Sequence, residues 1–161
     1  MIKLVFLRHT TATDIAHRDA DRALTLSGEN EAQLAGAGLA ALGVAPAVIL
    51  SSPLLRARQT AQFAAQAMKF TGPILPLNEL ANDHSTAKLL HTLKLYLQVG
   101  EELLLVGHMP SLAEHIGELT GAAFVDGFGK GSAALVELPE LSLGVGKMLW
   151  RKQLDELAEL A

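Results

Sequence analysis

The chain has 161 residues, half of them apolar, and carries a formal net charge of −4. This length is typical of one domain over residues 1–161, and the apolar content supports a core without disulfides or metal. The absence of cysteine excludes disulfides, thiolate nucleophiles and cysteine zinc sites, and the negative charge argues against a nucleic-acid partner held by a general electrostatic field.

The first predicted element is a buried strand at residues 2–7, a short β-branched and aromatic run. Arg8 and His9 follow where a signal peptide would continue its apolar run, so this segment is too short for one. Elsewhere in the sequence no apolar run is long enough to span a bilayer. We therefore expect a soluble, cytoplasmic protein with no membrane partner.

Residues 13–22 are charged and aperiodic, which indicates a surface loop. Thr25 or Ser27 is then expected to cap a helix that runs to about residue 42. Gly36 and Gly38 lower the helix propensity of this segment but allow the helix to approach a neighbour closely.

A second strand is predicted at residues 47–50. Ser52 as N-cap and Pro53 at the first helical position predict a helix directly after it. The apolar residues of that helix recur at helical spacing: Ala57, Ala61, Ala64, Ala65 and Met68. A third strand is expected at residues 73–77.

The second half of the chain continues the alternation of strands and helices. We expect a helix at residues 86–97, a continuous apolar strand at 102–106, and a helix that begins at Pro110 and ends near Gly121. Such alternation predicts an α/β fold, a three-layer sandwich with a mostly parallel central sheet and helices on both faces.

The last part of the chain is predicted to form a hairpin from residues 132–138 and 145–150. Residues 153–160 are expected to form a short amphipathic helix or a tail. The spacing of Leu154, Leu157 and Leu160 fits docking on the domain as well as pairing with another chain.

Chemistry-bearing residues follow two of the predicted strands. Arg8 and His9 follow the first strand, and His108 follows the strand at residues 102–106. Ligands of open parallel sheets bind at the carboxyl ends of the strands, so His9 and His108 would face each other if these strands are neighbours. Arg56 stands near the start of a helix that also begins at a strand end, where unpaired N–H groups attract phosphate.

The remaining arginines and histidines are interpreted separately. Arg56 and Arg58 are two residues apart on a helix and point to nearly opposite sides, so only one of them can reach a common phosphate. No His-x-His or His-x-x-x-His pair exists, so we expect no metal site. The other four histidines are interpreted as loop or core residues: His17, His84, His91 and His115.

Four segments together resemble one family. Leu-Arg-His ends at His9, and the other three segments are residues 22–28, 52–61 and 106–108. In order and spacing they are similar to the histidine phosphatase superfamily, which has an Arg-His-Gly signature and a phosphoglycerate mutase-like fold. The resemblance spans the chain from residue 2 to about residue 119. It implies that Arg56, and not Arg58, faces the phosphate.

The resemblance implies a covalent mechanism. His9 is the nucleophile that accepts the phosphoryl group, and Arg8, Arg56 and His108 surround the phosphate oxygens. A neutral imidazole is a competent nucleophile at cytoplasmic pH. Guanidinium groups and an imidazolium can neutralise the negative charge of the phosphoryl group during its transfer, so we expect no metal and no other cofactor.

The sequence departs from the family pattern at Thr10, which stands where the signature has glycine. A threonine there either narrows the site or offers its hydroxyl to the phosphate. A general acid for the leaving group is not evident; Glu79 is a candidate, and Asp14 and Asp83 are others. Arg22 precedes a family-like segment and is a further candidate for a place near the phosphate.

The substrate is expected to be protein phosphohistidine. Phosphohistidine expels imidazole, a better leaving group than an alkoxide, so it needs an enzyme acid less. The short chain leaves no room for long lids, which fits a shallow site and resembles the small SixA-type branch of phosphohistidine phosphatases. The alternatives are a general phosphomonoesterase for small phosphorylated metabolites and a low-activity phosphate-binding homologue, with a mutase ranked below both.

Overall fold

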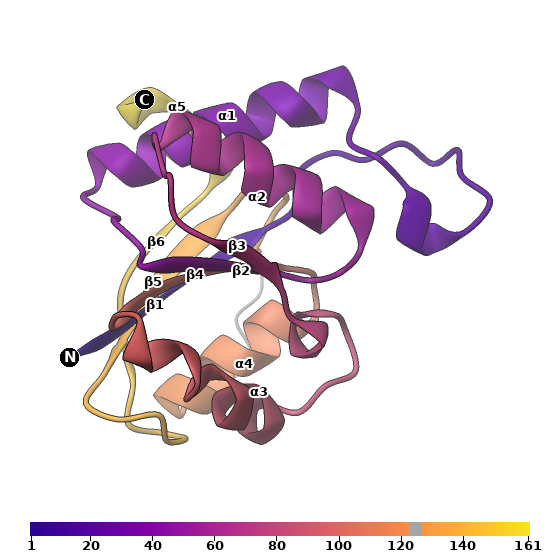
Figure 1. The fold of residues 1–161 in the computed structure, drawn as a ribbon. Coiled ribbons are helices and arrows are strands. Elements are labelled where there is room, and N and C mark those ends of the chain that lie inside the picture. The colour runs from indigo at the N-terminus through magenta and orange to yellow at the C-terminus, as the bar shows by residue number, and fades with distance from the viewer. Residues whose placement is uncertain (123–126) are drawn as a thin grey trace.

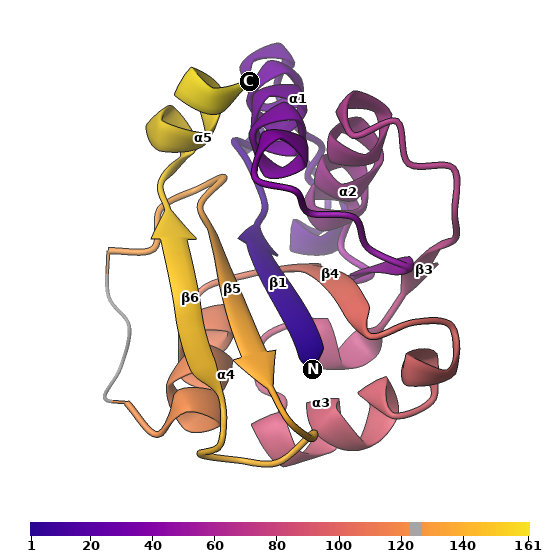
Figure 2. The same ribbon diagram turned by 90° about the vertical axis from the view of Figure 1, so that its left-hand side faces the viewer.

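The computed structural model describes residues 1–122 and 127–161, and within them six strands form one sheet in the order β3-β2-β4-β1-β5-β6. Strands β3, β2, β4 and β1 are parallel, β5 runs antiparallel to β1, and β6 runs antiparallel to β5. In chain order the strands are β1 (Ile2–Arg8), β2 (Val48–Ser51), β3 (Ile74–Pro76), β4 (Glu102–Gly107), β5 (Ala133–Leu138) and β6 (Lys147–Lys152). Figure 2 shows the β5–β6 hairpin beside β1, as predicted.

Helices cover both faces of this sheet (Figure 1). One face carries α1 (Leu26–Ala41), α2 (Leu55–Ala67) and α5 (Leu154–Leu160), and the other carries α3 (Thr86–Leu93) and α4 (Ser111–Thr120). Three short 3₁₀ helices are also present, η1 (Asp19–Asp21), η2 (Asn78–Leu80) and η3 (Tyr96–Gln98). The predicted three-layer α/β fold with a mostly parallel central sheet is therefore confirmed.

The central strands are buried on both faces because a helical layer packs on each side. Along β1, Leu4 and Phe6 point into the core beneath α3 and α4, whereas Val5 and Leu7 point into the core beneath α1 and α2. This arrangement explains why residues 4–7 of the first strand are all apolar and do not alternate with polar residues. The sheet is thus held rigidly, and so are the residues that follow its strands.

Two helix boundaries differ from the sequence prediction. Helix α2 has Leu54 as its N-cap, so Ser52 is not the cap and Pro53 is not in the first turn. The backbone N–H of Ser52 bonds to Val106 of β4, which extends the sheet past the predicted helix start. The helix predicted at residues 86–97 ends at Leu93, because the N–H of Leu95 bonds to Thr92 in a tighter turn.

The C-terminal segment is a helix that docks on its own domain. Gln153 and Glu156 form a capping box at its start, and Leu157 is fully buried against the α1 side of the core. A Cβ at Gly38 of α1 would overlap the Leu157 carbonyl, and a Cβ at Gly36 would overlap α2, so both glycines allow the predicted close approach. Across the described residues, none of the helices has the length and apolar character needed to cross a membrane.

Candidate active site

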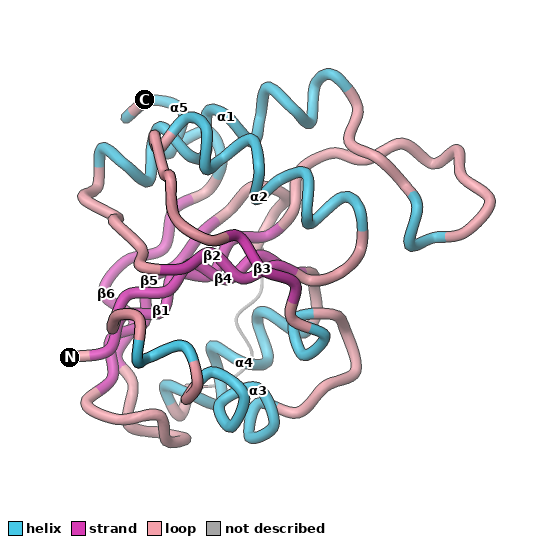
Figure 3. Tube along the Cα trace, in the orientation of Figure 1, coloured by secondary structure: helices cyan, strands magenta, loops and turns pink. Residues whose placement is uncertain are grey.

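Two histidines lie side by side at the carboxyl ends of β1 and β4. Arg8 pairs with Gly107 across these two strands, and the N–H of His9 donates to the Gly107 carbonyl at 3.0 Å. The imidazole centroids of His9 and His108 are 5.0 Å apart and the rings are tilted by 52°. The long loop between β1 and α1, which carries η1, projects beyond the same end of the sheet (Figure 3).

The imidazole of His9 is held in one tautomer. Its Nδ1 lies 2.8 Å from the carbonyl oxygen of Thr10, and a carbonyl can only accept, so Nδ1 carries the proton. The lone pair is therefore on Nε2. Burial, opposed by the hydrogen bond to the Thr10 carbonyl and assisted by the charges of Arg56, Arg8 and Lys130, lowers the pKa of His9 to about 4. His9 is thus neutral near pH 7, as a nucleophile must be.

His108 is anchored by a serine from the neighbouring strand. Its Nε2 lies 2.7 Å from Oγ of Ser52, and that oxygen also accepts the N–H of Leu54 at 3.2 Å. The other ring nitrogen, Nδ1, is buried and has no hydrogen-bond partner among the described residues. Burial and the neighbouring His9 and Arg56 lower the pKa of His108 to about 3.

Two arginines on different elements carry positive charges that act on this pair of histidines. Arg8 ends β1 and donates from Nη1 to the Phe128 carbonyl at 2.9 Å, while its buried Nε has no partner within the described chain. Arg56 is the second residue of α2 and is 8% exposed. The positive charges of Arg8 and Arg56 both contribute to the lowered pKa values of His9 and of His108.

Asp19 of η1 bonds to the guanidinium of Arg56. Nη1 of Arg56 donates to the Asp19 carbonyl at 3.0 Å, and Nη2 donates to its carboxylate at 3.2 Å. Arg22 donates to the same carboxylate and to the carbonyl of Thr13, so its guanidinium holds the loop together. Hydrogen bonds from Arg22 and Arg56 keep the pKa of Asp19 below its ordinary value, and the carboxylate is therefore charged.

The candidate general acids are placed as follows. Glu79 lies in η2, Asp14 forms an ion pair with Arg22, and Asp83 lies in a turn with a φ of +71°. In the part of the chain that the structure describes, no carboxylate bonds to either His9 or His108. The carboxylate of Asp19 is linked to the site by its hydrogen bond from Arg56.

Thr10 is part of the scaffold beneath the site. Its side chain is fully buried; its hydroxyl donates to the Gly28 carbonyl at 2.7 Å and its backbone N–H donates to Oγ1 of Thr60. Its backbone does not need glycine, because the non-glycine residues with positive φ in the described chain are Lys69 and Asp83. Of the two alternatives for Thr10, a hydroxyl offered to the phosphate is not seen in this conformation, because that hydroxyl donates to the Gly28 carbonyl.

Replacing Thr10 with valine tests this assignment. We expect the free energy of unfolding to fall by about 1–3 kcal/mol, because the buried Gly28 carbonyl loses its donor. Urea denaturation of the variant measures this change, and Thr71→Val, at an exposed position, is the matched control. Unchanged stability together with a loss of turnover would instead mean that the hydroxyl acts on the phosphate.

Three buried histidines make stability dependent on pH. His115 of α4 accompanies His9 and His108, since burial lowers its pKa to about 4 while Nδ1 bonds to the Thr86 hydroxyl at 2.6 Å. The unfolded chain binds protons below about pH 6.5 that the folded chain does not bind until about pH 4. We expect the free energy of unfolding to fall by roughly 2 kcal/mol or more between these values.

Denaturation curves at several pH values check this dependence. The variant His115→Gln should show a smaller loss between pH 6.5 and 4 than the wild type, whereas His91→Gln, at an exposed position, should match the wild type. Equal slopes for all three proteins would show that His115 titrates alike in the folded and unfolded states.

With this geometry in view, comparison with known proteins assigns the family. Residues 4–84 match the model of the histidine phosphatase superfamily (branch 1). The chain belongs to this superfamily. A relative in Picosynechococcus sp., itself uncharacterized, is 40% identical over 116 residues, which cover 70% of each chain. As a member of the histidine phosphatase superfamily, the protein is a phosphatase, which confirms the prediction of a hydrolase.

Solved structures of histidine phosphatases are similar over nearly the whole chain. The structure of the protein histidine phosphatase SixA in complex with tungstate superposes with a TM-score of 0.88 at 25% sequence identity. The match covers 97% of this chain and 99% of the SixA chain. A proposed phosphohistidine phosphatase SixA from Agrobacterium tumefaciens has a TM-score of 0.77 at 26% identity, with 94% and 97% covered. The likeness to SixA structures confirms the branch that the sequence resembles.

Two residues of the cluster were not predicted from the sequence, namely Ser52 and Asp19. Ser52 was interpreted as a helix cap, although its place at the end of a strand beside β4 is a signal for a contact with His108. Asp19 is one of several acidic residues in a charged loop, and nothing in its spacing separates it from Asp14 or Asp21.

Proposed function

We propose that residues 1–161 form one domain that removes phosphoryl groups through a phosphohistidine intermediate on His9. The observation that carries this proposal is the state of His9: a neutral imidazole, with Nε2 unprotonated, that lies beside a second histidine and whose pKa is lowered by the charges of Arg56 and Arg8. The proposal assigns the nucleophile to His9, its partner to His108, and the phosphate clamp to Arg8 and Arg56.

The reaction has two displacements at phosphorus. In the first, the lone pair on Nε2 of His9 attacks, an N–P bond forms, and the bond to the leaving group breaks with its electron pair. In the second, the oxygen of a water molecule attacks phosphorus, an O–P bond forms, and the N–P bond breaks with its electron pair returning to Nε2 of His9. The proton of the water passes to solvent, so inorganic phosphate and a neutral His9 are the products. Both transition states place negative charge on the equatorial oxygens, which Arg8 and Arg56 neutralise.

The contact between Ser52 and His108 supports a donor role for His108. The Ser52 hydroxyl can donate to Nε2 of His108, which leaves the imidazole proton on Nδ1, the atom that has no partner among the described residues. A phosphate oxygen would satisfy that buried N–H. His108 then stabilises the transferring group as a neutral donor, which agrees with its lowered pKa.

Asp19 marks where phosphate binds Arg56. Its carbonyl and carboxylate take two of the hydrogen bonds that a phosphate would accept from the guanidinium. Because like charges repel, a bound phosphate displaces this carboxylate from Arg56. Asp19 therefore holds the arginine in a binding orientation while the site has no anion.

Protein phosphohistidine is the proposed substrate. No described carboxylate bonds to the histidine pair, and phosphohistidine needs proton donation less than a phosphate monoester does. The likeness to SixA, a protein histidine phosphatase that binds the oxyanion tungstate, supports the same substrate class. We also propose that the protein is cytoplasmic and that its reaction needs no metal ion. Among the described residues, no three His, Cys, Asp or Glu side chains are grouped as a metal site needs.

Turnover of two substrates tests this proposal. The pure protein should hydrolyse a phosphohistidine peptide with a higher kcat/KM than p-nitrophenyl phosphate, and EDTA should change neither rate. Rapid turnover of sugar phosphates with none of the peptide would contradict the substrate and favour a general phosphomonoesterase. Tight phosphate binding without any turnover would favour a phosphate-binding homologue.

A further inference from the structure

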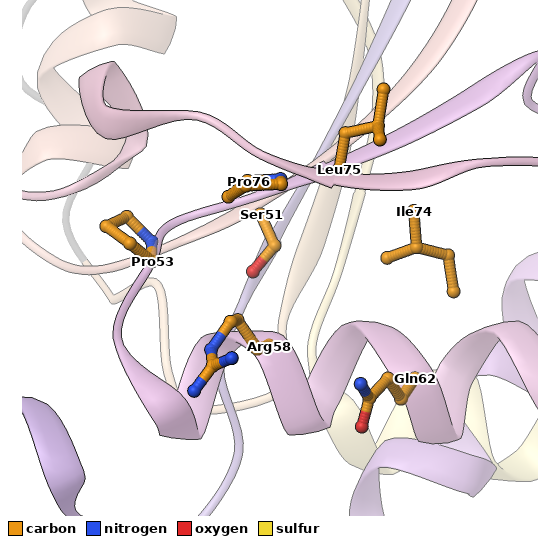
Figure 4. Close-up of a pocket in the computed structure, with 7 residues that line it drawn as sticks. All are labelled: Ser51, Pro53, Arg58, Gln62, Ile74, Leu75 and Pro76. Carbon is orange, nitrogen blue, oxygen red and sulfur yellow. The ribbon is translucent and has the colours of Figure 1, made fainter.

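A groove lies between the start of α2 and the edge strand β3 (Figure 4). Its volume is about 330 Å³. Arg58 and Gln62 of α2 form one wall, and Ile74 and Pro76 of β3 form the other, with Ser51 between them. The groove therefore pairs a polar wall with an apolar wall.

The groove lies at the same edge of the sheet as the histidine pair, because Ser51 and Pro76 end the parallel strands β2 and β3, and β2 lies between β3 and β4, the strand that His108 follows. Ser51 is the last residue of β2, and the next residue, Ser52, bonds to His108. Helix α2 serves both places: Arg56 bonds to Asp19 at the histidine pair, and Arg58, two residues on, lines the groove. A substrate protein with its phosphorylated residue at His9 would thus have neighbouring residues near this groove.

The guanidinium of Arg58 is available to a ligand. It makes no hydrogen bond or ion pair with any described residue, and its side chain is exposed. Its charge helps to lower the pKa of Asp21, but the Asp21 carboxylate is bonded to Arg18 at 2.9 and 3.3 Å. Gln62 lies one helical turn beyond Arg58 and adds an amide on the same wall.

We propose that this groove is a specificity subsite that binds an acidic side chain of the substrate protein, close in sequence to its phosphorylated residue. A guanidinium fork binds a carboxylate through two parallel hydrogen bonds, and the apolar wall accommodates the methylene groups of aspartate or glutamate. The chain carries a net charge of −4, so a local cation is needed to hold an acidic segment. This subsite rests on the proposed function as a protein phosphohistidine phosphatase.

Matched phosphohistidine peptides test the subsite. One set carries a single glutamate, moved one position at a time on either side of the phosphohistidine, and the other set carries glutamine at the same places. The wild type should prefer one or more glutamate peptides by about fivefold in kcat/KM, mainly through KM. Arg58→Gln should bring that ratio close to one, and Lys88→Gln, at an exposed position of α3, should keep it.

The outcomes separate the subsite from the reaction itself. Equal turnover of both peptide sets by the wild type, or a preference that Arg58→Gln retains, overturns the subsite and leaves the phosphatase assignment intact. Turnover of p-nitrophenyl phosphate with no turnover of either peptide set overturns the proposed substrate, and the subsite with it.

Discussion

Replacing His9 with alanine is expected to lower kcat/KM for p-nitrophenyl phosphate by about 10⁴-fold or more, since the variant has no atom that can accept the phosphoryl group. The side chain is 8% exposed, and the main chain of His9 remains bonded to Gly107, so the fold should be kept. Initial rates of the purified variant, with circular dichroism as the check on folding, measure this effect.

The matched control for His9 is His91, an exposed histidine on α3. His91→Ala should keep the rate of the wild type. If folded His9→Ala retained more than about a hundredth of the wild-type rate, His9 would be a binding residue and not the nucleophile.

Replacing Arg56 with alanine is expected to lower kcat/KM by about 10²–10³-fold. The guanidinium of Arg56 donates two hydrogen bonds to Asp19, the paired geometry that a phosphate also accepts, and its charge lowers the pKa of both histidines. Arg56→Lys should recover only part of this loss, because an ammonium keeps the charge but not the planar pair of donors. Steady-state kinetics with p-nitrophenyl phosphate, together with the inhibition constant of inorganic phosphate, measure the effect.

Lys88→Ala removes an exposed cation from another helix and serves as the control, with the expected rate of the wild type. A full recovery in Arg56→Lys would mean that charge alone matters at this position. An unchanged rate in Arg56→Ala would exclude Arg56 from the phosphate clamp and leave that role to Arg8.

The layered fold and the pairing of the two histidines follow from local features of the sequence. The apolar runs that precede Arg8 and Gly107 predict strands buried on both faces in the centre of the sheet, and the structure shows that these two strands are neighbours. Parallel neighbours end at the same edge, so His9 and His108 meet without any knowledge of the loops. Arg56 follows from the same rule, because α2 begins close to the end of β2.

Other contacts of the site do not follow from the order of the strands and depend on the tertiary structure. Serine is a residue type typical of helix N-caps, but the backbone of Ser52 extends the sheet and its hydroxyl bonds to His108. Thr10 bonds to Gly28 and Thr60, which are far away in sequence. The sequence alone therefore could not show whether the Thr10 hydroxyl bonds to the scaffold or to the substrate. Asp19 reaches Arg56 through the fold of a loop that has no periodic pattern.

The covalent intermediate is the central claim, and trapping it tests that claim most directly. The protein is mixed with a phosphohistidine peptide, quenched in alkali within the first turnover, digested and analysed by mass spectrometry. We predict one phosphoryl group on the peptide that contains His9, stable in base and lost in acid. A burst of product with no such group, or a phosphoryl group on another residue, would contradict the account.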